Sequence, residues 1–138
     1  MNALRRLLLG PGRLPDDLRA ALRAEGMVLL VEGAPGSATY RNLKTPGRRA
    51  NWKRTAVSAA VALSTKRFVV HAHRFKHIDV PITDLARYRI KATNPAPDRL
   101  QIDYDLSTTN PTRQGRVTLS LKTEEAARII RILTQPRP

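Results

Sequence analysis

The sequence predicts a mainly β protein (α+β): an antiparallel roll or barrel of seven to eight strands, with a C-terminal capping helix and a short helical N-terminal extension. Three observations lead to this fold class. After Gly26 the apolar residues change from helical spacing to the alternation that is typical of strands. Clusters of Gly, Pro and Asn separate short apolar runs, as they do in antiparallel barrels and sandwiches. The last apolar segment, residues 126–133, returns to helical spacing.

The first element is a helix that begins near Pro15, in an extension that we assign to residues 1–26. Pro suits the first position of a helix, and Asp16 and Asp17 complement the positive end of its dipole. Gly26 can end it. We expect the helix to pack on the main domain, residues 27–138, through one apolar face made of Leu14, Leu18, Ala21 and Leu22.

The segment before this helix is predicted to be a short helical or irregular arm, residues 1–14. Its leucines lie beside two arginines, so two interpretations stay open. The arm is an amphipathic anchor on a membrane, or it packs on its own domain or on a second copy. The residues concerned are Leu4, Arg5, Arg6, Leu7 and Leu8.

The main domain is predicted to contain up to eight strands, because turn chemistry divides it into short alternating runs. We expect strands at 27–32, 37–43, 53–63, 67–72, 77–82, 86–92, 99–106 and 115–121. The expected turns are at 33–36 (GAPG), 45–47, 94–98 and 110–115. A helix follows, with Thr123 as its N-cap and a buried stripe formed by Ala126, Ile129, Ile130 and Leu133.

Two segments carry a resemblance to a known family. Residues 62–70 (ALSTKRFVV) and 77–85 (HIDVPITDL), followed by an apolar last strand and a helix, resemble the PH-like superfamily, in particular GRAM and bacterial PH-like domains. The resemblance implies a non-enzymatic binding or scaffolding domain. Lipid-binding members grip inositol phosphates with basic residues on the hairpin between their first two strands. With that hairpin expected at 33–36, which has no basic residue, the inositide motif does not carry over.

The charge of the chain is strongly positive and unevenly placed. Lys and Arg number 25 against 11 Asp and Glu, giving a formal net charge of +14, and no acid lies between Glu32 and Asp79. Such a field attracts polyanions: nucleic acid, anionic lipid or an acidic protein. The competing interpretation is compositional, because an Arg-rich protein can simply reflect a GC-rich genome.

The basic field contains the predicted binding site, a loop with the only Trp among its cations. The predicted anion- or membrane-binding residues are Arg41, Lys44, Arg48, Arg49, Trp52, Lys53 and Arg54. An exposed indole beside cations can enter a lipid interface or stack on a base. Alternatively, Trp52 is partly buried against the barrel rim and the charges are only solvated. Nucleic acid is less favoured, because aromatic residues make up only 4% of the chain.

The three histidines form the second cluster of interest. If the strands at 67–72 and 77–82 pair around Phe75, then His73 faces His77 and His71 faces Asp79, and all four share one sheet face. That set is suited to zinc or a similar metal. It equally fits the polar solvent face of a strand or a pH-sensitive contact surface, so we predict no metal and keep these residues only as candidates.

No constellation for catalysis or for a cofactor is found. The chain has no Cys, its serines lack a nucleophile-elbow context, and no phosphate-binding glycine loop is present. The N-terminal apolar run is too short for a signal peptide, so we expect a cytoplasmic protein that can be peripheral at the inner face of the membrane. We therefore predict a non-enzymatic module that binds an anionic membrane surface or an acidic protein. The alternatives are a structural or assembly module, with a homo-oligomer as one form, and a metal-binding protein.

Overall fold

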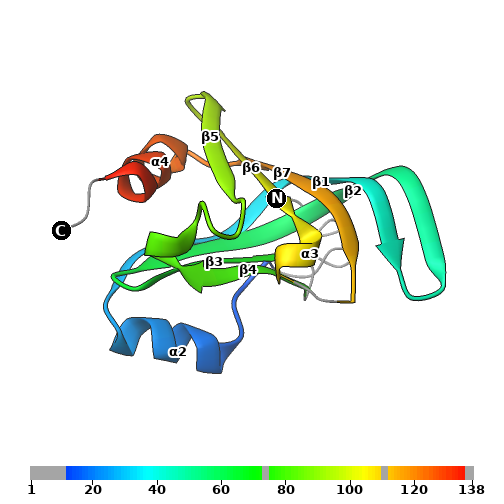
Figure 1. Cartoon of the computed structure of the whole chain (residues 1–138). Helices are drawn as coiled ribbons and strands as arrows, with labels where there is room; N and C mark the ends of the chain where they lie inside the picture. Colours follow the sequence, from blue (N-terminus) through cyan, green and yellow to red (C-terminus); the bar gives the residue numbers. More distant parts are fainter. Residues whose placement is uncertain (1–11, 73–74, 110–111, 136–138) are drawn as a thin grey trace.

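A single curled antiparallel sheet dominates the computed structural model, which describes residues 12–72, 75–109 and 112–135 (Figure 1). Its strand order is β4-β3-β2-β1-β7-β6-β5. The predicted fold class is thereby confirmed at the level of a mainly β half-barrel with an N-terminal and a C-terminal helix. The strands are β1 (Met27–Thr45), β2 (Arg48–Ser64), β3 (Arg67–Ala72), β4 (Phe75–Pro81), β5 (Lys91–Ala96), β6 (Arg99–Asp105) and β7 (Gln114–Lys122). The helices are α2 (Asp16–Ala24), the 3-10 helix η1 (Ile82–Asp84), α3 (Leu106–Thr109) and α4 (Ala126–Thr134).

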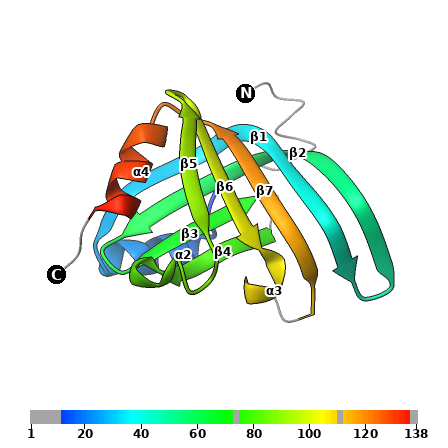
Figure 2. The same ribbon diagram turned by 45° about the horizontal axis from the view of Figure 1, so that its top comes forward.

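The curl of the sheet depends on the long first strand (Figure 2). The pairing of β1 with β2 shifts by one residue after Met27 and again after Val31, and such bulges bend and twist a strand. From Gly36 onward β1 also pairs with β7. A Cβ atom at Gly36 would collide with the carbonyl oxygen of Ser120, so only glycine lets the two strands approach this closely.

The expected turn at 33–36 is wrong, and with it the division of β1 into two strands. Gly33 has a φ of 71° and lies in the second bulge, while Gly36 lies at the contact with β7. These residues bend one continuous strand instead of reversing the chain. The first hairpin turn is at Pro46 and Gly47, where Thr45 is the partner of Arg48.

The strand expected at 86–92 is also wrong. After η1 the chain forms backbone hydrogen bonds of helical-turn type, from the amide of Tyr88 to the carbonyl of Asp84 and from the amide of Ile90 to the carbonyl of Leu85. These local hydrogen bonds use backbone N–H and C=O groups that would otherwise pair with a neighbouring strand. The strand β5 begins only at Lys91. The strand expected at 99–106 ends at residue 105, where the short helix α3 begins.

Each face of the sheet has its own core. The concave face and α4 enclose the main core, in which Ala126 and Ile129 are buried and Ile130 and Leu133 are half-buried, as predicted. The convex face carries α2. There Leu14 and Leu22 are buried and Leu18 is half-buried against Ala60, Ala62 and Val69, whereas Ala21 is exposed and does not belong to the packed face. The predicted N-cap Thr123 lies before the helix, where its hydroxyl accepts the amide of Glu125 at 3.1 Å.

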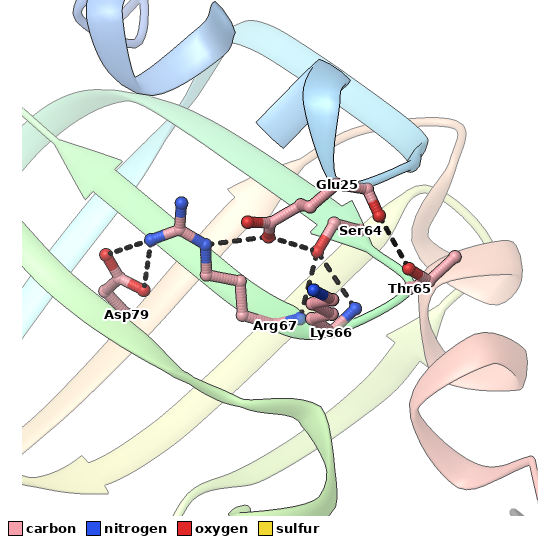
Figure 3. A network of polar contacts seen from close by, with 6 residues as sticks. All are labelled: Glu25, Ser64, Thr65, Lys66, Arg67 and Asp79. Atoms are coloured by element: carbon pink, nitrogen blue, oxygen red, sulfur yellow. Dashed lines mark hydrogen bonds and ion pairs between the residues drawn. The ribbon is translucent and has the colours of Figure 1, made fainter. Parts of the chain in front are cut away.

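A polar network holds the end of α2 against the sheet (Figure 3). The Arg67 guanidinium lies between two carboxylates, 2.8 Å from Glu25 and 3.0 Å from Asp79. The Ser64 hydroxyl donates to Glu25 at 2.6 Å, and Thr65 donates to the Glu25 carbonyl at 2.7 Å. The hydrogen bond from Ser64, followed by that from Arg67, lowers the pKa of the Glu25 carboxyl. The network thus ties the helix to the β2–β3 turn and to β4.

Candidate functional site

All seven predicted binding residues lie on the β1–β2 hairpin, which extends beyond the rest of the sheet (Figure 1). On one side of it β7 pairs with β1 as far as Lys44. On the other side β3 pairs with β2 only between Ala59 and Leu63. The hairpin is therefore one continuous basic element of the fold, and residues 33–36 have no part in its turn.

The hairpin carries cations on both of its faces. In β2, Val57, Ala59, Val61 and Leu63 belong to the concave core, whereas Ala60 and Ala62 pack on the convex face. Because side chains alternate along a strand, Trp52 and Arg54 continue the convex face and Lys53 continues the concave one.

The cross-strand partners complete each face. Arg41 is opposite Trp52 on the convex side, and Tyr40 is opposite Lys53 on the concave side. At the turn Lys44 is the partner of Arg49, and both line an open hollow of about 390 Å³ with Thr45 and Gly47. The backbone of Arg48 lies opposite Thr45.

The hairpin cations are not neutralised by neighbouring acids. Within the described part of the chain, no carboxylate lies within 4.0 Å of Arg41, Lys44, Arg49, Lys53 or Arg54. Elsewhere arginines do find acids, as in the pairs that Arg19 forms with Glu32 and Arg67 forms with Asp79.

Trp52 is 61% exposed, so most of its side chain faces solvent and only the smaller part is covered by the protein. The hairpin therefore presents a large apolar side chain to solvent among basic side chains.

The predicted histidine face does not form. Asp79 is the partner of Val69, so the predicted pairing of His71 with Asp79 is wrong, and a register shift after Val70 makes Lys76 the partner of His71. The resulting bulge in β4 turns His77 into the core, where it is 2% exposed. Asp79 remains on the convex face with Arg67. His73 lies outside the described residues, and among those that are described no three His, Asp or Glu side chains come together as metal ligands.

A buried pair takes the place of this cluster. The Nδ1 atom of His77 lies 2.5 Å from the phenolic oxygen of Tyr104, and the two rings meet edge to face. Burial lowers the pKa of His77 to about 3, so the imidazole is neutral at pH 7. Burial likewise raises the pKa of Tyr104. The burial of Tyr104 could be predicted from the sequence, because Tyr104 alternates with Leu100 and Ile102 along β6. No sequence pattern marks the bulge in β4 that buries His77.

The chain matches no protein-family model, no curated protein and no solved structure. Through residues 12–72, 75–109 and 112–135, no helix has both the length and the apolar character needed to cross a bilayer. The amphipathic arm predicted from Leu4, Leu7 and Leu8 lies outside these ranges.

Proposed function

We propose that this protein is a non-enzymatic interaction module that binds an anionic partner through its β1–β2 hairpin. The observation that carries the proposal is the set of unneutralised cations on this element, together with the exposed indole of Trp52. At physiological ionic strength salt largely screens exposed charges that are more than about 8 Å apart, so the partner's anionic groups must lie close to the hairpin. The hairpin cations are spaced along paired strands, so they act on one partner together. An anionic membrane surface and an acidic protein are the two partner classes considered.

The PH/GRAM-like resemblance is part of the same proposal. A strand order of β4-β3-β2-β1-β7-β6-β5 followed by a terminal helix supports it. With a first hairpin at 33–36, the inositide motif would have no basic residue in this chain. With the turn at Pro46 and Gly47, the basic residues do lie on the hairpin between the first two strands. That position favours an anion-binding role in this chain.

The experiment is sedimentation with phosphatidylserine vesicles and with neutral vesicles, alongside a titration with poly-L-glutamate that follows Trp52 fluorescence, each across a salt series. The double variant Lys53→Gln/Arg54→Gln removes one cation from each face of the hairpin. Each basic residue near an anionic surface contributes about 1 kcal/mol, so the variant should bind vesicles, which meet one face, about fivefold more weakly, and poly-L-glutamate, which can reach both faces, about thirtyfold more weakly. The control variant Lys122→Gln/Arg131→Gln removes two exposed cations near the other end of the fold.

We expect the control to bind as the natural protein does. The proposal fails if neither polyanion binds in a salt-sensitive way, or if the two double variants lose the same affinity. Failure of all binding would leave the assembly role, which light scattering tests as a stable oligomer.

A further inference from the structure

One edge of the hairpin has no strand beside it within residues 12–72, 75–109 and 112–135. The strand β3 ends at Ala72, which is already the partner of Phe75 in β4, so β3 cannot follow β2 toward the turn. Along residues 48–56 the only strand beside β2, among those described, is β1. Alternate backbone N–H and C=O groups of an edge strand point away from its one neighbour. This edge therefore offers a hydrogen-bonding template for a further strand.

The basic side chains along this edge favour an added strand that carries negative charge. Cross-strand neighbours on one face lie about 4.5–5.5 Å apart, and opposite charges at that distance stabilise the pair. An added strand would place alternate side chains beside Lys53 on the concave face and beside Trp52 and Arg54 on the convex face. Acidic residues on both faces, with apolar residues near Trp52, fit this arrangement.

We infer that the edge of β2 at residues 48–56 binds an extended acidic segment of a partner polypeptide as an added β-strand. The inference rests on the proposed function, because it specifies the partner of the same hairpin. A second copy of this edge is the wrong occupant, since it would set cations against cations. A bilayer can lie against only one face of the hairpin, whereas the cations occupy both.

The probe is a short capped peptide in which pairs of glutamates alternate with pairs of valines, so that each face of the extended peptide carries both residue types. Its matched control has the same sequence with N-methyl groups on two adjacent central valines. These groups block one backbone donor on each edge and leave the charge unchanged. Binding is followed by Trp52 fluorescence and by hydrogen exchange of the amides of residues 48–56 in the full chain.

We expect the unmodified peptide to bind and to protect these amides, and the N-methylated peptide to bind about tenfold more weakly. Lys53→Gln and Arg54→Gln should each weaken binding by about twofold to fivefold, because each face meets part of the peptide. Arg131→Gln, an exposed cation on α4, should have no effect.

Three results would overturn the inference while the proposed function stands. These are equal binding of the two peptides, binding without amide protection, and binding of phosphatidylserine vesicles or poly-L-glutamate by a protein that does not bind the peptide. If vesicles, poly-L-glutamate and the peptide all fail to bind in a salt-sensitive way, the inference and the proposed function both fail.

Discussion

The buried imidazole of His77 makes the stability of this fold depend on pH. The pKa of His77 is about 3 in the folded chain against an ordinary value of 6.5, because the ring is desolvated. Between pH 3 and pH 6.5 the His77 imidazole is protonated in the unfolded chain and neutral in the folded chain. Stability is therefore complete above pH 6.5 and falls as the pH falls toward 3.

The magnitude follows from the size of the pKa shift. Each pH unit in this window costs about 1.4 kcal/mol, so lowering the pH from about 7.5 to about 4.5 removes about 2.7 kcal/mol through His77 alone. His71 adds to the loss, because burial and the nearby Lys76 lower its pKa as well. A comparison that isolates His77 must therefore keep His71 in both proteins.

The assay is urea unfolding of the natural protein and of His77→Gln at several pH values in this range. Glutamine does not titrate, and its amide can still bond the Tyr104 hydroxyl. We expect the free energy of unfolding of the natural protein to fall by about 2.7 kcal/mol more than that of the variant. If the two curves run parallel, the histidine is not held neutral in the core and the reasoning is refuted.

Three further perturbations test other parts of the structure. Gly36→Ala should destabilise the fold by about 3 kcal/mol or lower the yield of folded protein, because its methyl group meets the Ser120 carbonyl. Thermal unfolding measures this change, and an unchanged midpoint would show that β1 and β7 are not this close. Arg67→Met should lower the free energy of unfolding in urea by about 1–2 kcal/mol, because it leaves Glu25 and Asp79 without their cation. An unchanged free energy of unfolding at low salt would contradict the network. Trp52→Ala should change stability by less than about 0.5 kcal/mol in urea unfolding followed by circular dichroism, while weakening binding to poly-L-glutamate as measured by titration calorimetry, because the variant lacks the only Trp. A large loss of stability would mean that the indole is buried.

Much of the secondary structure could be predicted because it follows from local spacing. The α4 stripe at Ala126 and Ile129 and the alternation of Leu100, Ile102 and Tyr104 are visible in the sequence and are found in the structure. Turn residues were a poorer guide. Gly and Pro at 33–36 have the chemistry of a turn, yet the same residues also suit a bulge and a close strand contact.

The cluster of cations could be predicted from the sequence, but its arrangement on the hairpin could not. A run of cations without acids is a property of the sequence, whereas the hairpin it lies on depends on where β1 reverses. The histidines show the same limit. One extra residue in β4 moved His77 from the solvent face to the core, because a register shift of one changes the face of every side chain beyond it.

The sequence by itself determined the fold class, the N- and C-terminal helices, and the excess of positive charge between Glu32 and Asp79. These follow from composition and from the spacing of apolar residues along the chain. Only the tertiary structure decided that β1 is one bent strand, that His77 is buried beside Tyr104, and that no described strand other than β1 lies beside residues 48–56. Each of these depends on which strand lies beside which, and in what register, and that pairing joins residues far apart in the chain.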